Sequence, residues 1–155
     1  MGPLYHLISP DKRLQVLKYA RQSVKPGGYI FSSFMTRTGA MIFGLKHNPA
    51  GILEPDGAEA VWKKGTDNSF IEGTKWFSNA YFSHPEEVNP LICEAGLEPL
   101  HLAGAEGIFG ERFELYHQMD EKLQKAWMNF TLDHCEDPHM VQQSKHLLSV
   151  ARNPA

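Results

Sequence analysis

The sequence lacks the features that mark several classes of protein. Its 155 residues include only two cysteines, Cys93 and Cys135, which cannot form a disulfide framework, so we expect a protein of the reducing cytoplasm. No apolar run reaches the roughly 18 residues of a membrane span, and the first residues lack the charged start and apolar core of a signal peptide. A net charge of −3 also lacks the basic excess of nucleic-acid-binding proteins, so we expect neither membrane nor nucleic-acid partners.

What is present is the composition of a soluble globular protein. Hydrophobic residues make up 42% of the chain and charged residues 21%, which is enough apolar material for a core with a solvated surface. The length suits one folding unit, and the sequence contains no internal repeat. We therefore expect residues 1–155 to form a single domain.

The first third of the chain predicts a helix, a tight turn and a strand. Ser9-Pro10-Asp11 is a typical helix start, since Ser can cap, Pro suits the first helical position and Asp favours the positive end of the helix dipole. The turn Lys25-Pro26-Gly27-Gly28 ends the helix predicted over 10–24. Residues 29–37, YIFSSFMTR, are rich in strand formers and predict a buried strand.

Residues 38–75 have a different character, with Gly, Pro, Asn and Asp scattered among two short helical candidates at about 39–46 and 56–64. We interpret this segment as an insertion or lid over one end of the sheet, because long connections in compact domains are often functional. Residues 76–82 follow as a short extended piece.

The second half predicts a helix, a strand, a longer helix and a last strand. Ser83 is the expected cap of a helix with Pro85 at its first position and Gly96 at its end. A strand over 97–107 follows, with Pro99 tolerated only near its start or on an edge. Residues 146–152, HLLSVAR, predict the last strand.

Residues 110–131 form the longest predicted helix. An apolar stripe follows its length, formed by Phe113, Tyr116, Leu123, Trp127 and Phe130. The stripe is most simply a face turned to the core. A dimer contact is the alternative, because Met119, Trp127 and Phe130 are residue types enriched at interfaces. Both interpretations stay open at this point.

Four segments occur in an order that points to a known family: MGPLYHL, VKPGGYIFSSF, EAGLEPL and SKHLLSVARNP. Together they resemble the C-terminal half of a class I S-adenosylmethionine-dependent methyltransferase. The resemblance implies that 29–36, 97–107 and 146–152 are strands five, six and seven, with the seventh antiparallel. The expected fold class is therefore α/β, a partial Rossmann-like methyltransferase sheet in the order five, seven, six, with flanking helices and a helical insertion.

The family's cofactor-holding features have no counterpart in this sequence. No Gly-x-Gly-x-Gly occurs, and Gly104, Gly107 and Gly110 come too late in the chain and lack the preceding strand–helix context of a nucleotide-binding loop. We therefore expect the C-terminal portion of a methyltransferase that acts on a small molecule, truncated and inactive as this fragment. The resemblance also implies that strand 29–36 lacks its neighbour, strand four, and has a bare edge. A homodimer, or a complex with the missing N-terminal half, is expected to cover that edge.

Candidate catalytic residues lie in the first segment of the resemblance. It places Tyr5 and His6 beside cofactor and acceptor, His6 as a general base with a pKa near neutrality and Tyr5 stacking on or hydrogen-bonding the ligand. Gly2, Pro3 and Leu4 are the implied contacts to S-adenosylmethionine. The alternative is that Tyr5 and His6 only pack the turn after the missing strand.

Candidate substrate-binding residues lie further along the chain. Arg37 follows the strand at its C-terminal edge, where ligands bind in open α/β sheets, and is a candidate for recognising an anionic acceptor. An aromatic cluster is formed by Trp76, Phe77, Tyr81, Phe82 and His84. From it we assign Trp76, Tyr81 and His84 to an acceptor pocket. A solvated loop charge for Arg37, and a core or hinge role for the cluster, are the competing interpretations.

Possible metal ligands are spread over the second half: His101, Glu106, His117, His134, Cys135 and His139. Zinc sites usually have paired ligands at short fixed spacings, and only one loose cluster occurs here, so we expect no metal. Cys93 falls on the apolar side of its predicted helix, and we expect it to be a buried small hydrophobe.

A different class of function is the main alternative. The chain is then a non-catalytic dimerising or ligand-binding module that reuses the half fold and binds its ligand in the 38–82 region. A third reading has two copies exchanging elements to rebuild a cleft between chains.

Overall fold

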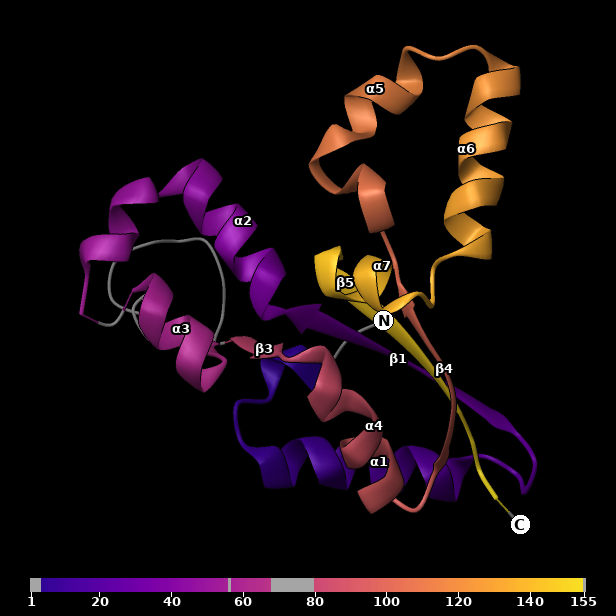
Figure 1. The fold of residues 1–155 in the computed structure, drawn as a ribbon. Coiled ribbons are helices and arrows are strands. Elements are labelled where there is room, and N and C mark those ends of the chain that lie inside the picture. The colour runs from indigo at the N-terminus through magenta and orange to yellow at the C-terminus, as the bar shows by residue number, and fades with distance from the viewer. Residues whose placement is uncertain (1–3, 56, 68–79, 155) are drawn as a thin grey trace.

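The computed structural model describes residues 4–55, 57–67 and 80–154. It is an α/β fold around an open mixed sheet with strand order β2-β3-β1-β5-β4 (Figure 1). The strands are β1 (Tyr29–Thr36), β2 (Thr66–Asp67), β3 (Ala80–Ser83), β4 (Glu98–Gly104) and β5 (His146–Arg152). The α/β class expected from the sequence is confirmed.

The last strand, β5, lies between β1 and β4 and runs antiparallel to both. Its register with β1 is continuous, from Tyr29 beside Arg152 to Met35 beside His146. Residues 29–36 and 146–152 are therefore neighbours, as expected. Pro99 lies near the start of β4 at the edge of the sheet, where its missing N–H costs no ladder bond, and the pairing shifts between Pro99 and His101.

The other side of β1 corrects two expectations, the three-strand order and the bare edge. β3 pairs in parallel with the end of β1, placing Met35 beside Phe82 and Thr36 beside Ser83, and β2 pairs with β3. The extended piece predicted at 76–82 thus corresponds in part to β3 and supplies a neighbour to β1, while the insertion contributes only β2, at the outer edge of the sheet. Only part of the edge is covered: among the described residues, no strand pairs with residues 29–34 on this side.

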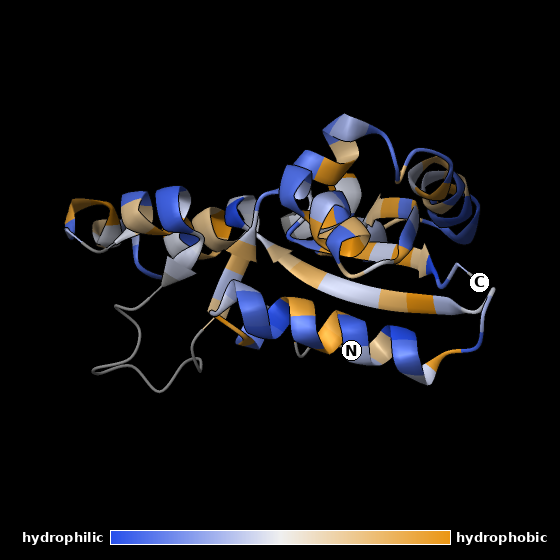
Figure 2. Cartoon of the chain, turned by 90° about the horizontal axis from the view of Figure 1, so that it is seen from below, coloured by the Kyte–Doolittle hydropathy of each residue, from blue (hydrophilic) through white to orange (hydrophobic). Residues whose placement is uncertain are grey.

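The core lies between one face of the sheet and two helices, α1 (Pro10–Ser23) and α4 (Pro85–Glu94), which contact one another and lie in the lower part of Figure 1. In Figure 2 the strands carry short hydrophobic stretches separated by paler segments, while α1 alternates between hydrophilic and hydrophobic residues, as a helix with one buried face does. Side chains from all these elements are buried together: Leu17, Ile30, Phe34, Val88, Ile92, Leu147 and Ala151.

Local sequence chemistry explains where α1 and α4 begin and end. The Ser9 hydroxyl accepts from the Lys12 N–H at the start of α1, as predicted. The cap of α4 is His84 rather than Ser83, because Ser83 is the buried last residue of β3. Gly96, with φ of +75°, takes the left-handed position after α4 that a side chain rarely adopts.

Cys93 is exposed, so the expectation that it is buried is wrong. The face of α4 turned to the core carries Val88 and Ile92, four residues apart on the same side of the helix. Cys93 follows Ile92 by one position, which turns it about 100° away from that face.

The insertion contains α2 (Arg37–His47), the 3₁₀ helix η2 (Pro49–Leu53) and α3 (Ala58–Lys64). Thr36, fully buried at the end of β1, connects it to the rest of the fold. The Thr36 hydroxyl accepts from the Gly39 N–H at 2.8 Å and donates to the Ser144 carbonyl oxygen at 2.7 Å. The start of α2 is thereby fixed at the C-terminal end of β1.

The single helix predicted over 110–131 is wrong. The chain instead forms η4 (Gly107–Arg112), α5 (Phe113–His117) and α6 (Glu121–Asp133), followed by α7 (Pro138–Gln143). Gly110 has non-helical backbone angles, and Asp120 caps a new helix by accepting from the Leu123 N–H at 2.9 Å. Asp137 and Pro138 are the cap and first residue of α7. Across the described residues, no helix combines the length and the apolar character needed to cross a membrane.

Candidate functional site

Several predicted site residues meet at the C-terminal end of β1. The 3₁₀ helix η1 (Leu4–His6) lies against both β1 and β3, and α2 begins at Arg37 directly after β1. β3 ends beside Thr36 and leads through His84 into α4. The carboxyl edge of two parallel strands is where open α/β sheets bind ligands, so this edge is the candidate site.

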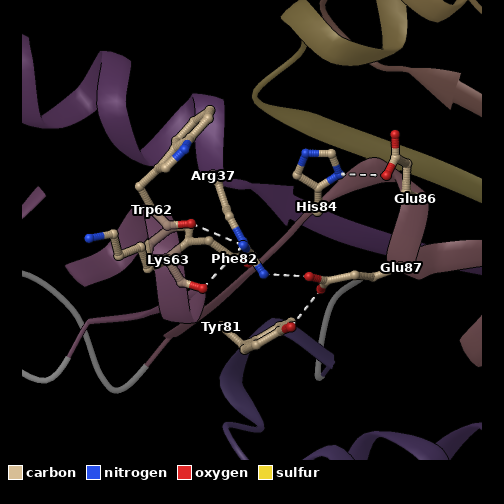
Figure 3. Close-up of polar contacts among 8 residues, drawn as sticks. All are labelled: Arg37, Trp62, Lys63, Tyr81, Phe82, His84, Glu86 and Glu87. Carbon is tan, nitrogen blue, oxygen red and sulfur yellow. Dashed lines mark hydrogen bonds and ion pairs between the residues drawn. The ribbon is translucent and has the colours of Figure 1, made fainter. Parts of the chain in front are cut away.

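Arg37 connects three elements at this edge (Figure 3). Its Nη1 donates to the carbonyl oxygens of Trp62 at 2.9 Å and Lys63 at 3.4 Å, at the end of α3, and its Nε donates to the Phe82 carbonyl oxygen at 3.4 Å. Its Nη2 forms an ion pair with one oxygen of the Glu87 carboxylate. The Arg37 side chain is 15% exposed and Glu87 is 38% exposed. The guanidinium of Arg37 thus binds groups of α3, β3 and α4 at the same time and connects these three elements.

Glu87 uses its second carboxylate oxygen to accept from the Tyr81 hydroxyl at 2.5 Å. Burial, together with the hydrogen bond to Glu87 and its negative charge, raises the pKa of Tyr81 above its ordinary value. The phenol therefore remains a protonated donor well into alkaline solution. Arg37 and Tyr81, both predicted as substrate contacts, are brought together through this one carboxylate.

Arg13 of α1 completes the cluster. Its guanidinium carbon lies 3.5 Å from the centre of the Tyr81 ring, in a cation–π stack, and its Nη1 donates to the carbonyl oxygens of Leu7 and Ile8 at 2.7 Å each. Arg13 is only 6% exposed, and this burial lowers its pKa from the ordinary value. The segment that follows η1 is thus fixed to β3 by a buried cation.

A groove of about 400 Å³ opens beside this cluster, between α1, α4 and β3. Its lining combines three carboxylates with one guanidinium, one phenol and several apolar side chains. The residues are Arg13, Phe34, Tyr81, Ser83, Glu86, Glu87, Val88, Pro90, Leu91 and Glu94. The groove is large enough for a small organic molecule, and its charge is predominantly negative.

The remaining predicted residues have separate places. Tyr5 and His6 lie on η1 with ring centres 4.6 Å apart, and Leu4 is buried in the core. His84 points its Nδ1 toward the Glu86 carboxylate at 3.9 Å, at the start of α4 (Figure 3). Gly2, Pro3 and Trp76 lie outside the described residues.

Sequence reasoning missed Arg13 and Glu87. In the sequence Glu87 looks like any acidic residue in the first turn of a helix, where it interacts favourably with the helix dipole. Arg13 is one of several charged residues of α1, and nothing in the sequence distinguishes it from the others. The partners of Glu87 come from positions 37 and 81, and those of Arg13 from 7, 8 and 81, so no local signal in the sequence identifies the cluster.

The possible metal ligands do not converge. Within the part of the chain that the structure describes, no three His, Cys, Asp or Glu side chains gather as a metal site would require. His101 pairs instead with Glu136 at 2.8 Å, and Glu106 binds the ring and the backbone N–H of His146.

The comparisons with protein-family models and with curated proteins found no relative of this chain.

Proposed function

We propose that the chain is the C-terminal, acceptor-binding portion of a class I S-adenosylmethionine-dependent methyltransferase that acts on a small molecule. The observation that carries the proposal is the position of β5, which lies between and antiparallel to β1 and β4, two strands that are parallel to one another. The three strands arise from the same segments that resemble strands five, six and seven of that family. A reversed last strand inserted between two parallel strands is the pattern that the resemblance requires.

The residues of this chain do not by themselves fit the cofactor. The sequence offers no glycine-rich turn that would let backbone approach it closely. Glu87, a carboxylate at the carboxyl edge of the sheet, is already bound by Arg37 and Tyr81 and is not available for ribose hydroxyls. Methyl transfer therefore requires cofactor-holding residues from outside these 155.

The open part of the β1 edge is the place where such residues would join. Residues 29–34 present backbone donors and acceptors with no described strand partner on the β3 side. Tyr29 and Phe31, 57% and 65% exposed, lie on the face of β1 away from the core. A strand added at this edge would satisfy the backbone groups, and the element following it would cover the apolar face.

The acceptor is assigned to the groove beside Tyr81. Its carboxylates, Glu86, Glu87 and Glu94, favour an uncharged or amine-bearing molecule over an anion, and its apolar wall offers Val88 and Leu91 to a hydrocarbon part. The resemblance puts His6 near the acceptor as a general base, which the contact of η1 with β3 supports.

The test is to read the coding DNA upstream of Met1 and to express the extended frame. We expect an in-frame strand followed by a glycine-rich turn, and binding of S-adenosylhomocysteine in the micromolar range by isothermal titration calorimetry. The 155-residue chain alone is the control and should bind at least a hundredfold more weakly. An upstream sequence without such a segment, or low-micromolar binding by the chain alone, would contradict the proposal.

A non-catalytic assembly module is the second candidate, and one observation favours it. Large apolar side chains of α5 and α6 face solvent rather than the core, among them Phe113, Leu123 and Phe130. If an extended frame is absent while the chain forms a stable dimer, this function replaces the first.

A further inference from the structure

Helix α6 packs on its own chain through a narrow strip. Thr131 is buried and faces Gly107 of η4, and the Trp127 ring contacts Phe109 with centres 6.2 Å apart. In Figure 1 α6 lies at the upper right, beyond the end of β4 and away from the sheet. A helix of 13 residues is marginal in water without tertiary packing, so contacts on its other sides would add to its stability.

One flank of α6 carries an apolar stripe that the fold leaves uncovered. Leu123, Trp127 and Phe130 follow the spacing i, i+4, i+7, which places them on one side of a helix. They are 49%, 40% and 43% exposed. Only the α6 part of the stripe predicted over 110–131 lies on one helix, and its side chains stay between two fifths and one half exposed, so its interpretation as a core face is wrong.

The charges on α6 favour a second copy in antiparallel orientation. Lys122 and Asp133 are 11 positions apart, about three turns, so they lie on the same side of the helix at opposite ends, next to the stripe. In an antiparallel pair, Lys122 of each copy lies near Asp133 of the other. A parallel pair would bring Lys122 near Lys122 and Asp133 near Asp133, which is repulsive.

We infer that the apolar flank of α6 is a dimer interface that binds α6 of a second copy of this chain in antiparallel orientation. The interface is isologous, with Leu123, Trp127 and Phe130 of both copies in its centre and the Lys122–Asp133 pairs at its two ends. It is separate from the candidate site and from the β1 edge, so it does not depend on the proposed function.

The test uses the whole chain in sedimentation equilibrium over a range of concentrations. Phe130→Glu and Leu123→Glu each place a charge in the centre of the stripe and should raise the dimer dissociation constant at least about tenfold. Leu132→Glu is the matched control, since Leu132 is 61% exposed but lies on the opposite flank, and it should leave the constant unchanged. Circular dichroism verifies that each variant is folded.

The charge pairs give a second test that does not depend on apolar truncation. Lys122→Glu and Asp133→Lys should each weaken the dimer by several-fold, because each creates like-charge contacts at both ends, and the double exchange should restore it. A chain that is monomeric at high micromolar concentration would overturn the inference. So would a dimer that Leu132→Glu or Phe31→Lys dissolves while Phe130→Glu leaves it intact; the Phe31 result would locate the contact at the β1 sheet instead.

Discussion

Replacing Glu87 tests whether its carboxylate holds the candidate site together. Glu87→Gln removes the negative charge that pairs with Arg37 and weakens the acceptor of the Tyr81 hydroxyl. A hydrogen bond to a charged group contributes about 1.5–3 kcal/mol when buried, but the 38% exposure of Glu87 brings the ion pair toward the surface value of about 0.2–1 kcal/mol. Because Glu87→Gln also weakens the hydrogen bond that the Tyr81 hydroxyl donates to residue 87, we expect the free energy of unfolding to fall by about 1–2 kcal/mol.

Urea denaturation measures this loss. The midpoint of Glu87→Gln should fall by roughly 0.5–1 M relative to the unchanged chain. Glu86→Gln is the matched control, because Glu86 is the adjacent residue, its side chain is 83% exposed and its partner His84 is 3.9 Å away. That variant should stay within about 0.5 kcal/mol. Equal midpoints for the two variants would refute the assignment of Glu87 as the residue that joins Arg37 to Tyr81.

Glu87→Gln should also change the pH at which Tyr81 loses its proton. Burial and then Glu87 raise the pKa of Tyr81, so the folded state disfavours the phenolate. The stability that this represents is fully present below the unfolded pKa, about 10, and is lost as pH rises through the higher folded value. In Glu87→Gln the pKa of Tyr81 should be lower, which ultraviolet absorbance of the tyrosinate measures against Tyr81→Phe as the blank. An unchanged titration would mean that burial alone sets this pKa.

Three further predictions concern the frame around the site. Gly104→Ala should cost about 1–3 kcal/mol in thermal unfolding because its Cβ would lie 2.2 Å from a buried hydroxyl oxygen, whereas Gly44→Ala, with nothing within 4 Å, should stabilise α2 by about 0.5–1 kcal/mol. Thr36→Val should cost about 2–4 kcal/mol in urea denaturation, since two buried hydrogen bonds lose a partner. Burial alone would raise the pKa of Glu106, but bonds from the His146 ring and backbone N–H hold it below its usual range. The unchanged chain should therefore lose stability as pH falls through the folded pKa of Glu106, and Glu106→Gln should show a flatter acid titration.

Elements bounded by local chemistry were predictable from the sequence. The cap at Ser9, the turn through Gly28 and the alternating residues of 146–152 are short-range signals, and α1, β1 and β5 lie within a residue or two of their predicted bounds. Asp120 and Asp137 carry the same kind of signal, but the aromatic stripe across 110–131 suggested one continuous helix. In the structure the caps determine where the helices begin, because a side chain that binds the N–H groups of a new first turn separates that helix from the one before it.

Features that depend on distant contacts were not predictable in this way. β3 and β1 are separated in the sequence by the whole insertion, and only the last two residues of β3 pair with β1. A pairing this short and this distant leaves no periodic pattern in the sequence from which it could be predicted. The joining role of Glu87 is similar, since its partner Arg37 is 50 positions away. The exposure of Cys93 required knowing which face of α4 turns to the sheet, and that depends on the angle at which the helix packs.

The order of the strands determines how the two uncovered surfaces relate. The open edge of β1 faces the β3 side of the sheet, whereas α6 belongs to the connection between β4 and β5, at the other end of the strand order. A strand added beside residues 29–34 would therefore extend the fold away from α6, and a second copy bound through α6 would not block it. Both surfaces carry exposed apolar side chains, Tyr29 and Phe31 on β1 and Leu123, Trp127 and Phe130 on α6, so covering each would remove apolar area from water. If two copies bind through α6 as inferred, each copy carries its own open β1 edge, so loss of the α6 contact should leave binding at that edge unchanged.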